Sequence, residues 1–203
     1  MKVVYGLGYT FFKAGAHLLF SYRVVGREHL IEDGPALVAS NHASFLDPPM
    51  VGIAFKEPIY FLARKTLFRG PFGWLFRRWN AVPVDQERAD FTSLKTIIKL
   101  LRGGERVLIF PEGERTRDGN LLGGKPGVGL VIAKAGVPVL PVRLFGTREA
   151  LPRDARFPRR TPITLVVGEP IVFSQEELKG GGKAGYADLS RRVMEAITAL
   201  KLP

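Results

Sequence analysis

The chain is 203 residues long, and 46% of its residues are hydrophobic, which is enough apolar material for one domain with a buried core. It contains no cysteine, so any mechanism that uses a cysteine nucleophile is excluded. Its 30 Lys and Arg residues against 19 Asp and Glu residues give a net charge of +11, which predicts attraction to a polyanion, either nucleic acid or an anionic membrane surface.

The N-terminal stretch, residues 3–20, is apolar except for Thr10, Lys13 and His17, which fall on one side of a helical wheel. Eighteen residues with a central lysine make a poor transmembrane span but suit an amphipathic helix that lies on a membrane surface. Two other interpretations stay open. The Ala14-Gly15-Ala16 triplet resembles a signal-peptidase site, although the apolar pattern continues beyond it, and the helix can also dock on the protein's own core.

A strand-like run at residues 36–40 leads into the stretch SNHASFLDPP. Asp47 followed by Pro48 is typical of a helix N-cap and first helical position, which places His42 in the turn between strand and helix. There the Asp47 carboxylate can accept a hydrogen bond from one imidazole nitrogen and stabilise the imidazolium that forms when the other nitrogen takes a proton. The alternative is that Asp47 only caps its helix and His42 only bonds backbone.

Basic and aromatic side chains alternate in residues 64–80, RKTLFRGPFGWLFRRWN. This composition suits the lipid headgroup boundary, where amphipathic aromatic rings settle and cations meet lipid phosphates, although part of the aromatic set must belong to the core. A nucleic-acid-binding module can show the same mixture, but the sequence carries no fingerprint of such a module.

A buried strand at residues 107–110 ends at Pro111 and is followed by a Glu-Gly turn and by Arg115 and Arg117. Binding groups collect at strand ends in α/β domains. A guanidinium at this place can hold a phosphate through two parallel hydrogen bonds.

Strand-like and helical segments alternate along the chain, which is typical of an α/β domain. We expect a single domain over residues 23–203, with a central mixed sheet flanked by helices, preceded by a membrane-associating helix at residues 1–22. The glycine-rich patch at residues 179–185 is expected to be a flexible connector. Further strands are expected near residues 59–63, 81–84, 139–142 and 163–167, and helices near residues 92–101, 127–135 and 184–200.

Three motifs resemble those of the glycerolipid acyltransferases. NHASFLD is similar to the first motif of this family, FPEGER to the third, and VPVLPVRLFGT, at residues 137–147, to the fourth. The blocks occur in the family's order, and the resemblance extends from about residue 20 to residue 172.

The resemblance implies transfer of a fatty acyl chain from a thioester, either acyl-CoA or acyl-carrier protein, to the free hydroxyl of a lyso-phospholipid acceptor. In that scheme His42 is the general base and Asp47 orients it, since an alcohol needs a positioned base to attack a thioester at neutral pH. No metal and no bound cofactor are implied. An acyl-enzyme on Ser44 is an alternative, but the position of Ser44 in the turn suggests turn chemistry.

The second family motif matches less well. The family usually has a glycine, a short apolar run and a basic residue that contacts the acceptor's phosphate. In this chain Asn80 occupies the glycine position and Gln86 the basic position, so Arg88 is a candidate substitute. The alternative is that residues 85–88 begin a solvated helix.

The resemblance also assigns acceptor-binding residues. Glu112 and Gly113 are expected to shape the acceptor pocket, Arg115 to bind its phosphate, and Lys125 to be either a further phosphate contact or a solvated loop charge. We expect the acceptor to be 1-acyl-glycerol-3-phosphate (lysophosphatidate), giving phosphatidate in phospholipid biosynthesis. The alternatives are another lyso-lipid acceptor and a basic nucleic-acid-binding or membrane-binding module without catalysis.

The expected location follows from the same reasoning. We expect a peripheral or monotopic protein on the cytoplasmic face of a membrane, where both acyl donors occur. Its partners are then an anionic membrane surface, a lyso-phospholipid acceptor and an acyl-CoA or acyl-carrier protein donor, and not nucleic acid.

Overall fold

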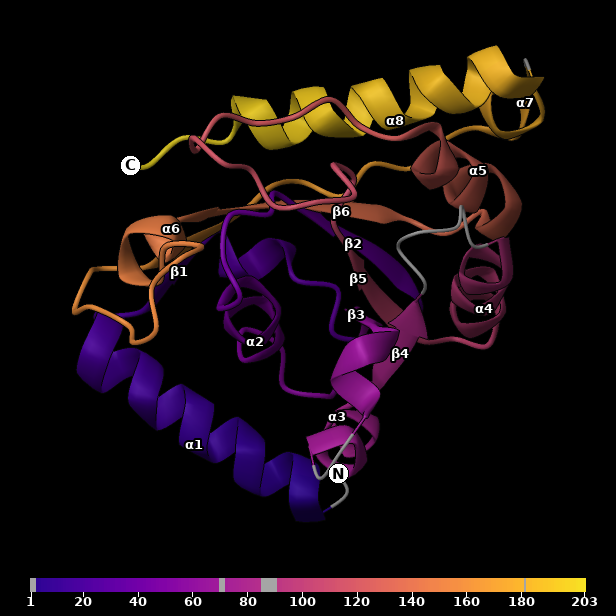
Figure 1. The fold of residues 1–203 in the computed structure, drawn as a ribbon. Helices are drawn as coiled ribbons and strands as arrows, with labels where there is room; N and C mark the ends of the chain where they lie inside the picture. Colours follow the sequence, from indigo (N-terminus) through magenta and orange to yellow (C-terminus); the bar gives the residue numbers. More distant parts are fainter. Residues whose placement is uncertain (1–2, 70–71, 85–90, 181) are drawn as a thin grey trace.

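The computed structural model describes residues 3–69, 72–84, 91–180 and 182–203, and within these ranges seven strands form one sheet in the order β1-β7-β6-β2-β5-β3-β4 (Figure 1). All neighbouring strands pair in parallel except β6 and β7, which are antiparallel. The sheet is therefore mixed, as expected. Its strands are β1 (Arg23–Val25), β2 (Ala36–Ser40), β3 (Tyr60–Arg64), β4 (Ala81–Val84), β5 (Arg106–Ile109), β6 (Val139–Phe145) and β7 (Thr164–Val167).

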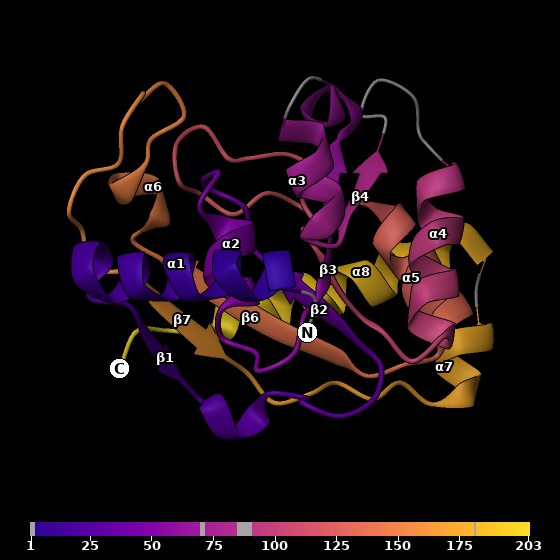
Figure 2. The same cartoon turned by 90° about the horizontal axis from the view of Figure 1, so that it is seen from below.

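Helices cover both faces of the sheet (Figures 1 and 2). The helical segments are α1 (Val3–Phe20), η1 (Arg27–His29), α2 (Asp47–Gly52), η2 (Lys65–Phe68), α3 (Phe72–Arg78), α4 (Phe91–Arg102), α5 (Pro126–Ala135), α6 (Thr147–Ala150), α7 (Gln175–Lys179) and α8 (Gly182–Ala199). Successive side chains of a strand point to opposite faces, so β2 sends Val38 toward α1 and α2 and sends Leu37 and Ala39 toward α4, α5 and α8. Both layers are apolar, which explains why the central strands are continuous apolar runs.

The expected elements lie within a few residues of the observed ones, but the short helical segments η1, η2, α6 and α7 were not expected, and three further differences stand out. Strand β1 was not expected, because it has three residues and is only half-buried. Helix α3 falls in the basic and aromatic segment, whose composition suggested a surface rather than an element. The glycine-rich connector expected at residues 179–185 is largely helical, because Lys179 ends α7 and Gly182 begins α8.

Helix α1 packs on the body of the protein and also keeps an apolar side outward. Ala16 and Phe20 are buried in the same core as the sheet. On the opposite side of the helix Leu7, Phe11 and Leu18 are 68%, 74% and 79% exposed. Docking and an exposed apolar stripe therefore coexist in one helix. Among the described helices, none has the length and apolar character that crossing a membrane requires.

Helices α5 and α8 approach each other closely at Gly129. A Cβ added to Gly129 would lie 1.8 Å from the backbone oxygen of Tyr186 in α8, so an alanine there must push the two helices apart. We expect Gly129→Ala to lower the free energy of unfolding by about 3 kcal/mol, the upper range of overpacking effects.

The matched control is Gly15→Ala in α1, where an added Cβ meets no heavy atom within 4 Å. This substitution should leave stability unchanged or raise it by about 0.5–1 kcal/mol, because alanine is the better helix former. Urea denaturation of both variants measures the difference. Equal losses in the two variants would show that the α5–α8 contact is looser than described.

Candidate active site

The segments that follow β2, β5 and β6 leave the sheet at the same end of these strands. Strand β2 pairs in parallel with β5 on one side and with β6 on the other. The carboxyl ends of parallel strands lie together, and binding sites of α/β sheets collect there. The turns after β2 and β5 carry the residues that the sequence marked as a candidate site, and β6 borders them (Figure 2).

The structure brings His42 and Asp47 together. Nδ1 of His42 lies 2.8 Å from Oδ2 of Asp47, and the same oxygen accepts hydrogen bonds from the backbone N–H groups of Ala43 and Ser44, both at 2.7 Å. Asp47 is the first residue of α2 rather than its N-cap, which is Leu46. The N-cap expectation was therefore wrong by one residue, and the carboxylate turns back to bind the preceding loop.

This contact fixes the tautomer of the neutral His42 imidazole. A carboxylate only accepts hydrogen bonds, so Nδ1 carries the hydrogen and Nε2 of the neutral ring is an acceptor. The ring stacks on Phe110, with 3.9 Å between centroids and an angle of 15° between the planes. The His42 side chain is 18% exposed, whereas Asp47 is fully buried. His42 is thus held rigidly with one edge open to the site.

Glu112 holds the backbone of the His42 turn. Its carboxylate is fully buried, and its two oxygens accept hydrogen bonds from the N–H groups of His42 and Leu122, each at 2.8 Å. Burial raises the pKa of Glu112, and the two amide hydrogen bonds oppose this rise. Glu112 therefore positions the His42 turn through hydrogen bonds to main-chain N–H groups.

Asn41 and Ser44 tie the same turn to neighbouring segments. The Asn41 side chain donates to the carbonyl of Leu144 at 3.0 Å and accepts from its N–H at 2.7 Å. The Ser44 hydroxyl donates to the carbonyl of Leu151 at 2.9 Å and accepts from the N–H of Leu46. Among the described contacts there is no Ser44–His42 hydrogen bond, so the geometry gives no support to a serine nucleophile.

Arg115 lies over an aromatic ring next to this turn. Its guanidinium carbon is 3.7 Å from the centroid of Phe45, and its Nη1 is buried with no hydrogen-bond partner in the part of the chain that the structure describes. Burial lowers the pKa of Arg115, as do the positive charges of Arg153 and Arg64. In the described part of the chain Arg115 forms no ion pair with a carboxylate, and such a guanidinium is suited to hold an anion.

A cavity of about 600 Å³ opens beside His42 and Arg115 and extends between α1, α2, β3 and α3. Its remaining polar walls include Arg64 and Glu114. Most of the lining is apolar and includes Tyr9, Phe12, Leu46, Ile53, Ile59, Phe61, Leu67, Phe76, Trp79 and Phe110. The arrangement joins a large apolar space to a histidine and to a positive charge.

The other expected site residues lie outside this cavity. Gly113 adopts φ 75°, which favours glycine, and a Cβ there would come within 3.2 Å of the Lys125 side chain. Lys125 itself is exposed and precedes α5. Arg88 and Gln86 lie outside the described residues. No group of His, Asp or Glu side chains in the described ranges is arranged to hold a metal ion.

Sequence reasoning missed two groups of residues. Arg64 lines the cavity, and its only signal was a basic residue directly after an expected strand. The sequence did not show which aromatic residues of segment 64–80 lie inside the protein: Phe76 and Trp79 line the cavity, whereas Trp74 is 56% exposed. Asn80 stands where the related motif has glycine, and it adopts φ 57°, a left-handed conformation that asparagine tolerates better than most residues.

The sequence model of the protein family described as Acyltransferase matches residues 21–144 of this chain. The chain belongs to the acyltransferase family. It is 35% identical over 164 residues to a chloroplastic 1-acyl-sn-glycerol-3-phosphate acyltransferase of Arabidopsis thaliana, a match that covers 78% of this chain and 46% of that protein. With the 1-acyl-sn-glycerol-3-phosphate acyltransferase of Bacillus subtilis the identity is 30%, and the match covers 73% of each protein.

The fold of this family member is also found among solved structures. The crystal structure of the 1-acyl-sn-glycerophosphate acyltransferase PlsC from Thermotoga maritima superimposes with a TM-score of 0.75 and 27% identity, covering 98% of this chain and 81% of that one. The chain spans just under half the length of the Arabidopsis relative.

The role of Glu112 can be tested through stability. In Glu112→Gln one carboxylate oxygen becomes an NH₂ group that faces a backbone N–H, so a buried donor loses its acceptor. We expect the free energy of unfolding to fall by about 1–3 kcal/mol. Glu114→Gln is the control, because Glu114 is exposed and its substitution should change stability by less than about 0.5 kcal/mol. Denaturant titration compares the two, and equal stability would argue against the backbone role.

Proposed function

We propose that this chain transfers a fatty acyl group from a thioester donor, acyl-CoA or acyl-carrier protein, to the free hydroxyl of 1-acyl-glycerol-3-phosphate, giving phosphatidate. One observation carries the proposal: the 2.8 Å contact between His42 and a buried Asp47 at the wall of an apolar cavity that Arg115 also lines. The relatives from Arabidopsis thaliana and Bacillus subtilis, both 1-acyl-sn-glycerol-3-phosphate acyltransferases, support it.

In the proposed reaction His42 is the general base. Its Nε2 takes the proton of the acceptor hydroxyl as that oxygen attacks the thioester carbonyl, and Asp47 stabilises the imidazolium that forms. The new ester C–O bond forms, the C–S bond breaks, and the proton passes from His42 to the leaving sulfur. No acyl-enzyme is required, and no oxidant or reductant enters the balance.

The cavity accounts for the fatty chain. Its apolar walls exclude water from a hydrocarbon tail, and burying each methylene contributes about 0.8 kcal/mol. With the tail in this space, the thioester carbonyl lies near His42, which lines the same cavity. Burial of the fatty acyl chain thereby positions the reacting carbonyl.

The acceptor's phosphate is assigned to Arg115. The buried Nη1 lacks a hydrogen-bond partner among the described groups, and a phosphate oxygen supplies one. Glu112 and Gly113 shape this region by holding the turn, and Arg88 and Lys125 are further candidate contacts from the sequence. Arg64 adds positive charge on the same side.

The first twenty-two residues are proposed to associate with the cytoplasmic face of a membrane. The outward side chains of Leu7, Phe11 and Leu18 provide the apolar stripe of an interfacial helix. Replacing all three with serine should reduce sedimentation with vesicles while leaving the fold intact, and Leu202→Ser, at an exposed apolar site outside α1, is the control. Undiminished vesicle binding by the triple variant would refute this role. Deletion of the helix is a poorer test, because Ala16 and Phe20 belong to the core.

The catalytic assignment predicts a loss of rate without a loss of fold. We expect His42→Ala to lower kcat by roughly 10²- to 10⁴-fold, and Asp47→Asn to lower it by less. His17→Ala is the control, because that ring is exposed on α1. A radiolabelled acyl-transfer assay, with circular dichroism to confirm folding, measures the effect. A folded His42→Ala protein with the wild-type rate would rule out this mechanism.

The acceptor assignment predicts a selective change in binding. Arg115→Ala should raise the KM for lysophosphatidate by roughly 10- to 10²-fold, the size expected for a charge-assisted hydrogen bond, and should leave the donor KM nearly unchanged. Arg115→Lys should restore only part of the affinity, because lysine lacks the planar fork. Arg117→Ala, an exposed site two residues on, is the control.

A panel of lyso-lipids with both donors decides the acceptor. Faster transfer to a zwitterionic or phosphate-free lyso-lipid than to lysophosphatidate would point to another acceptor. A defect of Arg115→Ala that falls only on the donor would remove the phosphate role of this residue.

A further inference from the structure

The segment that connects α6 to β7, residues 151–162, is dense in arginine. Arg153, Arg156, Arg159 and Arg160 are all exposed, and the only acidic residue in the segment is Asp154. In the described part of the chain none of these four guanidiniums forms an ion pair with a carboxylate. The segment therefore presents concentrated positive charge that the protein itself does not neutralise.

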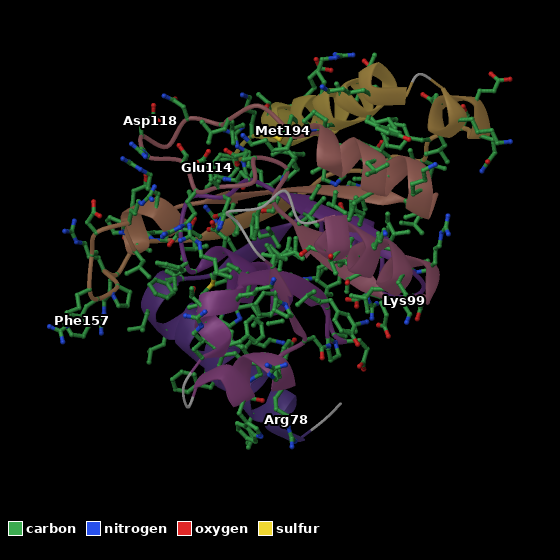
Figure 3. The ribbon with its side chains drawn as sticks, turned by 45° about the vertical axis from the view of Figure 1, so that its right-hand side comes forward. Arg78, Lys99, Glu114, Asp118, Phe157 and Met194 are labelled. Atoms are coloured by element: carbon green, nitrogen blue, oxygen red, sulfur yellow. The ribbon has the colours of Figure 1, made fainter. Side chains whose placement is uncertain are left out.

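An aromatic side chain projects from the middle of this arginine loop. Phe157 is 72% exposed, and Figure 3 shows it pointing away from the body of the protein. The Arg156 guanidinium lies 5.7 Å from its ring centroid. An exposed aromatic ring flanked by cations matches the requirements of the lipid headgroup boundary, where the ring enters the apolar layer and the cations meet phosphates.

The arginine loop is tied to the active site. The carbonyl of Leu151, its first residue, accepts the hydrogen bond of the Ser44 hydroxyl in the His42 turn. The N–H of Arg159 donates to the carbonyl of Ala150 at 2.7 Å, which closes the loop on itself. The charge of Arg153 acts on Arg115. The position of the loop is therefore coupled to the catalytic turn.

The loop also lies on the side of the molecule where the cavity is built. In Figure 2 the loop after α6 and helix α3 rise on the same side of the sheet, the side to which β4 points, and α1 runs between them. Helix α3 carries the exposed Trp74 with Arg78 at 5.0 Å from its ring. Two cation–aromatic pairs thus flank the same side.

We propose that the arginine loop, residues 151–162, docks on an anionic lipid surface, with Phe157 inserted among the headgroups, and thereby turns the mouth of the cavity toward the bilayer. The proposal rests on the proposed function in one respect: the acceptor is a lipid that must reach His42 from that bilayer. Charge complementarity selects this occupant, since four unpaired guanidiniums meet an anionic surface.

The test uses the full chain and vesicles of phosphatidylcholine with and without phosphatidylglycerol. A basic residue at an anionic surface contributes a factor of roughly five to partitioning, so replacing Arg156, Arg159 and Arg160 with glutamine should lower the partition coefficient about 10²-fold on anionic vesicles. Binding to neutral vesicles should change little. The charge-matched control replaces Lys134, Lys179 and Lys183, which are exposed on α5, α7 and α8, with glutamine and should retain most of the binding.

Phe157→Ser tests insertion of the ring. Loss of a buried aromatic side chain should lower partitioning about tenfold, whereas Val172→Ser, at a site 75% exposed and outside the loop, should not. Unchanged vesicle binding by the arginine variant, or an equal loss in the lysine control, overturns the proposal. A loss of transfer from acyl-carrier protein alone, with vesicle binding intact, also overturns it and assigns the loop to an acidic protein partner.

Activity in detergent micelles separates this proposal from the proposed function. The arginine-loop variant should acylate micellar lysophosphatidate at the wild-type rate and should be slowed only on vesicles. If the wild-type protein transfers no acyl group in micelles, the proposed function fails while the vesicle experiment still decides the docking surface. A variant slowed equally in both assays refutes a role confined to the membrane.

Discussion

One carboxylate oxygen organises the candidate active site. Oδ2 of Asp47 accepts hydrogen bonds from the imidazole of His42 and from the N–H groups of Ala43 and Ser44. A buried carboxylate without partners costs several kcal/mol, and these three donors offset the cost of burying Asp47. The backbone conformation of the turn brings all three N–H donors to this oxygen, and it thereby also sets the orientation of the imidazole.

The turn keeps this shape because the sheet supports it from both sides. The parallel register of β2 with β5 and β6 brings Glu112 to the amide of His42 and Leu144 to the side chain of Asn41. Each contact joins residues far apart in sequence. The site is therefore a property of the folded sheet and not of the motif alone.

The sequence indicated the contact between His42 and Asp47, but not the residues that support their turn. The contact was expected from the turn and helix signals around His42 and Asp47, their roles came from the family resemblance, and the strands were marked by apolar runs. The buried role of Glu112 was not visible, because nothing local shows which carboxylate will be enclosed by a neighbouring strand's turn. The three-residue β1 has too weak a pattern to detect. The choice between docking and exposure for α1 also depended on tertiary packing, since both faces of that helix carry apolar residues.

Helix α1 forms a wall with two different sides. Gly8, Tyr9 and Phe12 line the cavity, while Leu7 and Phe11 face outward. An α-helix with its side chains is about 10 Å across, so only that thickness separates the interior space from the surroundings. At Gly8 even a methyl group would collide with the ring of Trp79, at 2.6 Å. The volume of the cavity therefore depends on how tightly α1 packs on the rest of the protein. Any environment that loosens this packing enlarges the cavity.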